Sequence, residues 1–316
     1  MIPTKELVLE AGNRVAPYVH RTPVLTSRLL DDIAGAKLYF KCENLQKMGA
    51  FKMRGAINAI QQLTEEERKA GVVTHSSGNF GQALALAANN LGVTAYVVMP
   101  SSAPAVKIEA VKAYGARIVI SEPTLEARER EANKIVKETG AVFIHPSNDL
   151  NVIIGQGTAA LELLEDYPDL DCILTPVGGG GLIAGTALAA HYFGKDCEVI
   201  GGEPFAVDDA YRSLRSGKIE DNTNTNTIAD GLRTHLGDIN FPIIKSLVSE
   251  IIRVDEEEIT DAMRLIWERM KIIIEPSSAV PFAAVLREKE LFKNKHIGII
   301  LSGGNVDLLK ISFLNR

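Results

Sequence analysis

Residues 171–190 read DCILTPVGGGGLIAGTALAA, in which four consecutive glycines separate two apolar runs. The first run, Asp171 to Val177, predicts a buried strand, and Leu182 to Ala190 predicts a helix. A strand that leads through a short turn into a helix is the repeating unit of α/β folds with parallel sheets. Such folds bind their ligands at the carboxyl ends of the strands, which is where Gly178, Gly179, Gly180 and Gly181 stand.

The glycine turn has two interpretations. Residues without Cβ atoms can take positive φ angles and turn successive N–H groups inward, and the following helix adds free N–H groups and the positive end of its dipole. These groups would hold a phosphate dianion. Alternatively, the glycines only let helix and sheet pack closely. Four glycines at one junction favour the phosphate site. The spacing of a nucleotide triphosphate loop is absent, while a dinucleotide remains possible.

Composition limits the functional class. The chain has 316 residues, enough for two domains, with 46% hydrophobic and 23% charged residues. A net charge of −6 without a dense Lys/Arg run argues against nucleic-acid binding. No apolar stretch has membrane-spanning length, and the N-terminus has no signal-peptide pattern. Cys42, Cys172 and Cys197 are scattered, as in a reducing compartment. We therefore expect a cytoplasmic protein that binds neither nucleic acid nor membrane.

Short β-branched runs alternate with helical patterns along the chain. The candidate strands are Lys37–Cys42, Val72–Ser76, Thr94–Met99, Arg117–Ile120, Ala141–His145, Cys172–Val177, Glu198–Gly202 and Ile297–Ser302. This alternation predicts an α/β fold of two domains, each with a mostly parallel twisted sheet flanked by helices. Residues 70–146 would form the small domain, and residues 1–69 with 147–316 the large one. Polar loops after three strands, including Ser76-Ser77-Gly78-Asn79 and Ser302-Gly303-Gly304-Asn305, predict a ligand crevice between the domains.

One lysine stands out. The segment Ala50-Phe51-Lys52-Met53-Arg54 places Lys52 between apolar neighbours near the start of a predicted helix. A partly desolvated lysine is less often protonated, so its amine can attack a carbonyl group. The alternative is a surface lysine beside Arg54, and the heptapeptide from Ala50 to Ala56 does not separate the two.

Together these segments resemble a known family. In their order and separations they are similar to the pyridoxal-phosphate enzymes of the tryptophan-synthase-β type (fold type II), in the branch of serine racemases and serine/threonine dehydratases. The segments that carry the resemblance are Phe51-Lys52-Met53-Arg54-Gly55-Ala56, Ser76-Ser77-Gly78-Asn79, Gly178 to Gly181 and Ser302-Gly303-Gly304-Asn305. His20-Arg21-Thr22-Pro23-Val24-Leu25 and Glu275-Pro276-Ser277-Ser278-Ala279 extend it over nearly the whole chain.

The resemblance implies a role for each of these segments. Lys52 would form a Schiff base with pyridoxal 5′-phosphate, whose ring would pack against Phe51. The phosphate would lie on Gly178, Gly179, Gly180 and Gly181. The remaining implied contacts are Asn79 with the phenolic oxygen of the ring, Ser302 with the pyridine nitrogen, and Ser76, Ser77, Gly78 and Asn79 with the amino-acid substrate. The resemblance also implies a homodimer.

The residue at the pyridine nitrogen bears on the reaction. A carboxylate there would keep the nitrogen protonated, whereas the hydroxyl of Ser302 only shares a hydrogen bond and leaves the ring a weaker electron sink. A ring that withdraws electrons weakly suits reactions in which the electrons released at Cα leave at once with a substituent on Cβ. Loss of water from L-serine or L-threonine, giving a keto acid and ammonia, is such a reaction. The alternatives are a predominant serine racemase and a 3-hydroxyaspartate dehydratase.

Ser77 is a second candidate acid/base group. In the racemases that this chain resembles, the lysine and this serine lie on opposite faces of the substrate, so a proton can leave one face and return to the other. The alternative is that Ser77 caps the helix predicted over Gly81–Leu91.

Carboxylates after one strand suggest a cation site. Glu203 and Asp209, with the Val207 carbonyl, would suit Mg²⁺, or Ca²⁺ or Mn²⁺, and the resemblance assigns these three residues. The alternative is an acidic surface turn.

A function from a different class also remains open, because a non-catalytic nucleotide-binding module on the same scaffold would need no covalent cofactor. His235 would either face a distal substrate carboxylate or lie in a solvated loop.

Overall fold

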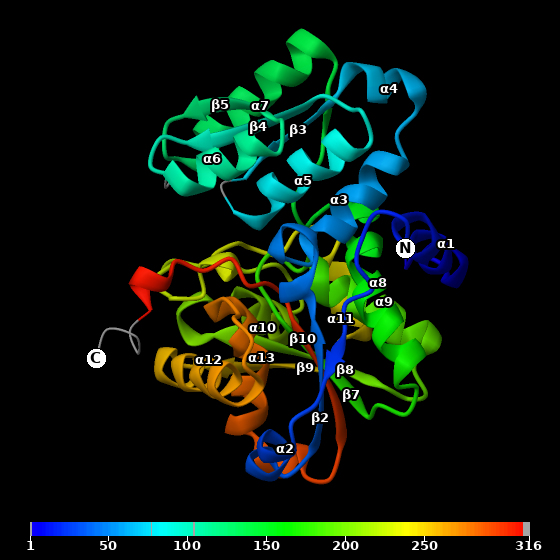
Figure 1. Cartoon of the computed structure of the whole chain (residues 1–316), viewed down its shortest axis with the longest axis vertical. Coiled ribbons are helices and arrows are strands. Elements are labelled where there is room, and N and C mark those ends of the chain that lie inside the picture. The colour runs from blue at the N-terminus through cyan, green and yellow to red at the C-terminus, as the bar shows by residue number, and fades with distance from the viewer. Residues whose placement is uncertain (1, 77, 104, 312–316) are drawn as a thin grey trace.

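The computed structural model describes residues 2–76, 78–103 and 105–311, without the side chains of residues 106 and 310. It confirms the predicted fold class, because two sheets of mostly parallel strands are flanked by helices (Figure 1). The strands are β1 (Val24–Leu25), β2 (Lys37–Cys42), β3 (Val72–His75), β4 (Ala95–Pro100), β5 (Arg117–Ser121), β6 (Val142–Phe143), β7 (Cys172–Pro176), β8 (Glu198–Pro204), β9 (Glu250–Val254) and β10 (His296–Leu301).

The helices cover both faces of each sheet. They are α1 (Lys5–Val15), α2 (Arg28–Ala34), α3 (Lys52–Gln61), α4 (Glu65–Ala70), α5 (Asn79–Asn90), α6 (Ala105–Ala113), α7 (Leu125–Thr139), α8 (Leu150–Asp166), α9 (Gly181–Phe193), α10 (Asp209–Ser216), α11 (Phe241–Leu247), α12 (Glu256–Met270), α13 (Pro276–Arg287) and α14 (Lys289–Phe292). Short 3₁₀ turns are η1 (Glu43–Leu45), η2 (Lys47–Gly49), η3 (Phe205–Val207), η4 (Asp230–Leu232) and η5 (Leu308–Lys310). No helix of the described chain has both the length and the apolar character needed to cross a bilayer.

The six-stranded sheet has the order β1-β2-β10-β7-β8-β9, in which β1 is antiparallel to β2 and the other neighbours are parallel. Alternate residues of each strand point to opposite faces. Ile173 of β7 packs in the core under α8 and α9, whereas its neighbour Leu174 packs with α12 and α13 on the other face. The parallel strands bring the ends of β7, β8 and β10 to one edge, next to the glycine turn.

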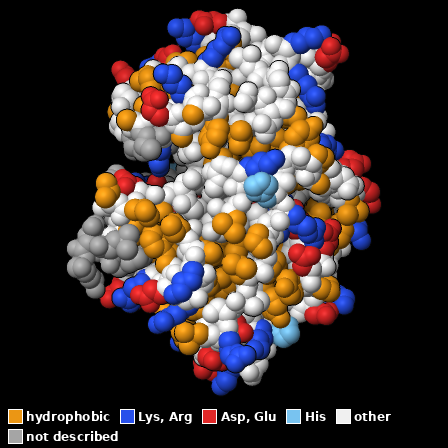
Figure 2. All heavy atoms as spheres, in the orientation of Figure 1, with side chains coloured by type: hydrophobic (Ala, Val, Ile, Leu, Met, Phe, Trp, Pro, Cys, Tyr) orange, Lys and Arg blue, Asp and Glu red, His pale blue; other side chains and the backbone are white. Residues whose placement is uncertain are grey.

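The four-stranded sheet has the order β5-β4-β3-β6 with every pair parallel. Val72 faces the core shared with α5, and Val73 faces α7. This sheet occupies the upper part of Figure 1, and the surface in Figure 2 is hollowed at the left between it and the lower part. The expected domain boundaries at residues 70 and 146 lie outside all strands and remain a prediction.

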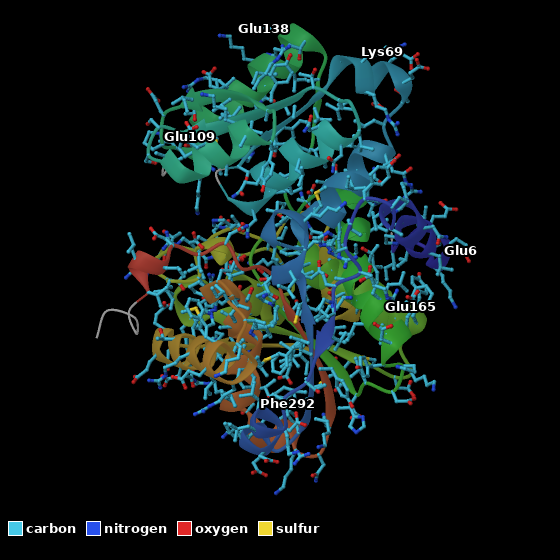
Figure 3. The ribbon with its side chains drawn as sticks, in the orientation of Figure 1. Glu6, Lys69, Glu109, Glu138, Glu165 and Phe292 are labelled. Carbon is cyan, nitrogen blue, oxygen red and sulfur yellow. The ribbon has the colours of Figure 1, made fainter. Side chains whose placement is uncertain are left out.

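A buried charge network holds α3 in place. The Arg54 guanidinium contacts Glu43 of η1 at 2.8 Å and Glu162 of α8 at 2.7 Å, and Lys41 of β2 contacts Glu162 at 2.6 Å. The side chains of Arg54, Glu43 and Lys41 have no exposed surface. Other charges point outward, as Lys69 and Glu138 do at the top of Figure 3. Buried pairs of this kind fix geometry, since removing one partner leaves an uncompensated charge. The network therefore fixes the helix that begins at Lys52.

Candidate active site

The glycine turn lies between β7 and α9, as predicted. Gly180 is the N-cap of α9 with a positive φ of 78°, a conformation that favours glycine. The four positions are also crowded by the protein itself. A Cβ at Gly178 would lie 2.9 Å from the Cα of Leu232, one at Gly180 would lie 2.7 Å from Cδ2 of Leu236, and one at Gly179 would collide with the Ser147 hydroxyl. Close packing therefore requires glycines here, whatever the ligand.

The turn nevertheless presents free donors. Within the described chain, no protein acceptor bonds the backbone N–H groups of Gly178 to Gly181. The turn is held from its carbonyl side instead, because Asn240 donates from Nδ2 to Gly179 O at 2.8 Å and to Ser147 O at 3.1 Å. Free N–H groups at the start of a helix are the groups that bind phosphate. The close-packing and phosphate interpretations are thus compatible at this turn.

Lys52 is the first residue of α3, and its amine is held in the interior. Nζ donates to the Pro146 carbonyl at 2.8 Å and lies 4.9 Å from the ring centroid of Phe51 and 5.8 Å from that of Phe80. Burial lowers the pKa of Lys52 to about 8, although the negative charge of Glu275 opposes the shift. A lowered pKa increases the neutral fraction of this amine near neutral pH, which favours a nucleophile and base over an ordinary surface lysine.

Asn79 joins the two sheets at the first turn of α5. Its Nδ2 donates to both carboxylate oxygens of Glu275 at 3.1 Å, and its Oδ1 accepts from Asn305 Nδ2 at 2.9 Å. Burial raises the pKa of Glu275 to about 7, while the hydrogen bond from Asn79 limits the rise. A carboxyl group that titrates near neutrality thus lies beside a side chain expected to contact the cofactor.

Ser302 lies at the end of β10 and is fixed to the lysine segment. Its carbonyl accepts from Phe51 N at 3.0 Å, and Ala50 forms a bridge with Gly303. Its buried hydroxyl lies 3.0 Å from Ser278 Oγ of α13. The segment that carries Lys52 and the residue expected at the pyridine nitrogen are therefore adjacent.

The loop between β3 and α5 is described in part. Ser76 Oγ accepts from Gly78 N at 3.3 Å, and no described atom lies within 4 Å of a Cβ built on Gly78. Ser77 lies outside the described residues. The helix begins two residues earlier than predicted, at Asn79, and its N-cap is Gly78. Gly78 offers no side chain to cap the helix, and the capping role considered for Ser77 stays a prediction.

His145 was not among the predicted site residues. Its Nδ1 accepts from Asn148 N at 2.8 Å and from Ser147 N at 3.2 Å, so this nitrogen carries no proton. Burial lowers the pKa of His145 to about 4, with further lowering by His75 and Lys52. A neutral His145 thus fixes the loop whose Pro146 carbonyl holds Lys52 and whose Ser147 covers the glycine turn.

The predicted cation ligands form a buried acidic pair. Glu203 lies inside β8 and not in the loop after it, because β8 pairs with β9 as far as Pro204. Its carboxylate accepts from Ala210 N at 3.0 Å and Tyr211 N at 2.8 Å. Asp209 is equally buried. The burial of both side chains excludes the alternative of an acidic surface turn. Burial and the charge of Asp209 raise the pKa of Glu203 well above its usual range.

Asp209 connects this pair to the glycine turn. It accepts from Asn222 Nδ2 at 2.5 Å and from Leu236 N at 3.2 Å, and the Leu236 side chain lies against Gly180. Burial raises the pKa of Asp209 to about 6. Among the described residues there is no group of three or more His, Cys, Asp and Glu that could hold a metal, so a backbone carbonyl would have to complete the ligands.

His235 does not support a substrate carboxylate contact. Its Nδ1 lies 3.2 Å from the Asp221 carboxylate and 3.4 Å from Asn222 N, in an exposed loop. The solvated-loop interpretation is the one that the structure supports.

The expected cofactor and substrate residues that the structure describes thus form one connected set. It runs from the glycine turn through Ser147 and Lys52 to Ser302, Glu275 and Asn79. Four members were missed as functional residues, namely His145, Ser147, Glu275 and Ser278. Glu275 and Ser278 lie in a segment that carried the family resemblance, and this was the available signal. The contact of Ser147 with Gly179 depends on folding, which brings residues far apart in the sequence together.

Comparison with known proteins agrees with this geometry. A sequence profile described as "Pyridoxal-phosphate dependent enzyme" matches residues 15–303. A serine racemase from Dictyostelium discoideum is 53% identical over 311 residues, covering 96% of this chain and 95% of that protein. An L-threo-3-hydroxyaspartate ammonia-lyase from Saccharomyces cerevisiae is 46% identical over 315 residues, covering 99% and 97%. The crystal structure of the Dictyostelium discoideum serine racemase superposes with a TM-score of 0.94 at 52% identity, covering 98% of this chain and 100% of that one.

Proposed function

The chain belongs to the family of pyridoxal-phosphate-dependent enzymes, and we propose that it removes water from L-serine or L-threonine, giving a keto acid and ammonia, and also interconverts the enantiomers of serine. The observation that carries the proposal is Lys52. Its amine is buried with a pKa of about 8 and lies at the junction of the segments that would hold the cofactor. Two similar proteins, named as a serine racemase and a hydroxyaspartate ammonia-lyase, support the choice of β-hydroxy amino acids as substrates.

The residues present fit the cofactor. The free N–H groups of Gly178 to Gly181 suit its phosphate, and the ring of Phe51 lies beside the Lys52 amine, which would attach to the aldehyde. Asn79 and Ser302 carry hydrogen-bonding groups that suit a phenolic oxygen and a ring nitrogen. When bound, pyridoxal phosphate supplies a ring that takes up the electrons of the bond broken at Cα.

The protein side chains would handle the protons. We assign to Lys52 Nζ the removal of the proton from Cα of an L-substrate and its transfer to the β-hydroxyl, which leaves as water. The released enamine then hydrolyses to the keto acid and ammonia. Ser76, Gly78 and Asn79 would bind the substrate carboxylate near the N-terminus of α5, where the helix dipole favours an anion. Ser77 would return a proton to the opposite face of Cα, which is the step that racemisation needs.

Three further features belong to the proposal. Glu203, the Val207 carbonyl and Asp209 would hold Mg²⁺, Ca²⁺ or Mn²⁺, since a cation would offset two buried carboxylates whose pKa values are raised. Cysteines free of disulfides fit work in the cytoplasm. The family resemblance supports a homodimer.

The proposal is tested by incubating the cofactor-loaded protein with L-serine, L-threonine, D-serine and 3-hydroxyaspartate, and measuring both the keto acid and the opposite enantiomer. We expect keto acid from the L-substrates and D-serine from L-serine. Lys52→Ala should lose all turnover and the absorbance of lysine-bound cofactor, whereas Lys69→Ala, at an exposed lysine of α4, should keep both. A colourless parent protein that turns over no substrate would favour the non-catalytic binding module.

A further inference from the structure

The buried hydroxyl groups of Ser278 and Ser302 share their hydrogens with the backbone of Gly303, so Ser302 can donate to a ligand only if the Ser278 hydrogen is rearranged. Ser278 Oγ accepts from Gly303 N at 2.7 Å and lies 2.7 Å from Gly303 O and 3.0 Å from Ser302 Oγ. A hydroxyl group has one hydrogen and two acceptor lone pairs. The single hydrogen of Ser278 therefore points either to the Gly303 carbonyl or to Ser302, and its direction decides what Ser302 can do.

In the first arrangement, Ser278 donates to the Gly303 carbonyl. The Ser302 hydrogen must then go to Ser278, and Ser302 offers only lone pairs to a ligand. In the second, Ser278 donates to Ser302, and the Ser302 hydrogen is free. The Gly303 carbonyl keeps a partner in both, because Glu275 N donates to it at 3.0 Å. Turning the Ser278 hydrogen thus leaves no buried backbone group unpaired, but it removes the hydrogen between Ser278 Oγ and Gly303 O, so these two oxygen atoms must move apart from their 2.7 Å contact when Ser302 donates to a ligand.

We propose that Ser278 is a positioning residue that makes Ser302 a hydrogen-bond donor toward the ring nitrogen of the bound cofactor. This inference rests on the proposed function, which places that nitrogen at Ser302. The donors then form one chain, from Gly303 N–H through the Ser278 hydroxyl to the Ser302 hydroxyl and the nitrogen. Hydrogen bonds in such a chain polarise and strengthen one another.

The chain has a chemical consequence. A neutral nitrogen that accepts a strengthened hydrogen bond withdraws more electrons than an unbonded one and fewer than a protonated one. Both serines are buried, so water does not compete for these groups. The electron demand of the ring is then set by Ser278, which need not touch the cofactor.

The test uses cofactor labelled with ¹⁵N at the ring nitrogen, loaded into the full-length protein, and reads its ¹⁵N chemical shift. Ser302→Ala should move the shift toward that of an unbonded pyridine, and Ser278→Ala should move it part of the way. Ser277→Ala, at the adjacent buried serine whose Oγ accepts from Gly231 N, should leave it at the parent value. A loss of stability alone would not move this resonance in folded, loaded protein.

Ser278→Thr keeps a hydroxyl group and should return the shift to the parent value. A threonine shift equal to that of Ser278→Ala would assign the effect to packing and overturn the proposal. If Ser278→Ala binds the labelled cofactor with an unchanged shift, this inference fails while the proposed function stands. If the parent takes up no labelled cofactor, both fail together.

Discussion

At the scale of single residues, burial shifts the pKa values of two titratable groups, Lys52 and Glu275, toward each other. The ordinary pKa of lysine is near 10.5, and burial brings that of Lys52 to about 8. Burial acts in the opposite direction on Glu275, whose pKa rises to about 7. The negative charge of Glu275 also acts on Lys52, whose pKa it raises against the effect of burial. The carboxylate thus limits the loss of positive charge from the amine.

The first prediction concerns the pH dependence of cofactor binding by Lys52. Only a neutral amine attacks an aldehyde, so the rate at which the apoenzyme combines with pyridoxal phosphate should rise with pH and level off above about 8. Glu275→Gln removes the charge that raises the lysine pKa and should move the midpoint to lower pH. Stopped-flow absorbance measures both rates.

Glu268→Gln is the matched control, because this carboxylate is exposed on α12 and its loss should leave the midpoint unchanged. A midpoint near 10.5 in the parent would show that the amine is not desolvated as the structure indicates.

The site could be predicted at this scale only in part. Lys52, Asn79 and Ser302 were identified through motifs, and the structure places them in one connected set. His145 and Ser147 gave no comparable signal. His145 acts through the backbone N–H groups of its own loop, and Ser147 meets Gly179 of a distant segment, a contact that exists only after the chain has folded.

At the scale of elements, the glycine turn between β7 and α9 is shaped by two demands. Its Cβ positions are filled by neighbouring loops, and its N–H groups are free of protein acceptors within the described chain. A single substitution in the turn would disturb both the packing and the phosphate contacts, so its effect could not be assigned to one of the two. The contact between Gly179 and Ser147 allows a separation, because the serine side chain can be removed.

The second prediction uses this pair. Gly179→Ala should lower thermal stability, since its Cβ meets the Ser147 hydroxyl, and Gly179→Ala with Ser147→Gly should regain most of that stability. If the turn binds phosphate, the added methyl group should still hold the phosphate away from the backbone N–H groups in the double variant. We then expect the cofactor to bind about tenfold or more weakly, since weakening a hydrogen bond to a charged group costs about 1.5–3 kcal/mol. Cofactor titration followed by absorbance gives the affinity.

Ser147→Gly alone is the control for effects of the serine on affinity. Full recovery of both stability and affinity in the double variant would leave close packing as the whole reason for the glycines.

The third prediction concerns the acidic pair at β8 and α10. The folded-state pKa of Asp209 is raised from 3.8 to about 6, so without a cation its contribution to stability is present at low pH and is lost as the pH rises through about 6. Mg²⁺ should restore stability by binding the folded state, with a larger rise in melting temperature above pH 6 than below it. A chelator should reverse the rise and lower activity.

Glu203→Ala should abolish this response, whereas Asp208→Asn should keep it, because Asp208 is engaged with Arg212 and Arg253 at 2.8 Å and 2.9 Å. An equal response to Mg²⁺ in Glu203→Ala and the parent would place the cation elsewhere.

Most elements could be predicted from periodicity, and the misses have physical reasons. All eight expected strands exist, with ends displaced by a few residues. β1 is only two residues long, too short for any alternation to be visible. β9 carries Glu250 and Arg253 at the sheet edge, and Arg253 lies over the Tyr211 ring, 3.8 Å from its centroid. Two charged residues in a run of five hide the apolar pattern that would have predicted this strand, which forms by pairing with β8.

At the scale of the whole molecule, the site is assembled from both sheets. Lys52 follows β2 of the six-stranded sheet, and the loop from Ser76 to Asn79 follows β3 of the four-stranded one. The two parts meet through Asn79 and Glu275, and through Lys107 of α6 and Asp230 of η4 at 3.2 Å. On the proposed function, a substrate between them would meet one acid/base group from each part, Lys52 and Ser77.

The last prediction tests whether both groups are used. If Lys52 takes the α-proton of an L-substrate and Ser77 serves the opposite face, Ser77→Ala should keep the elimination of L-serine. Racemisation and the turnover of D-serine should collapse, because the second face loses its proton donor and a misplaced water replaces it poorly. Measuring pyruvate and D-serine from the same L-serine incubation gives the ratio directly.

Ser76→Ala is the matched comparison, since a weaker hold on the substrate carboxylate should reduce both reactions together. If Ser77 served only to stabilise the loop, Ser77→Ala would cost about 1 kcal/mol of folding free energy and scale both reactions equally. An equal loss, after correction for the folded fraction, would therefore reject the two-base assignment. Loss of racemisation alone would show that the four-stranded part contributes a proton donor and does more than close over the substrate.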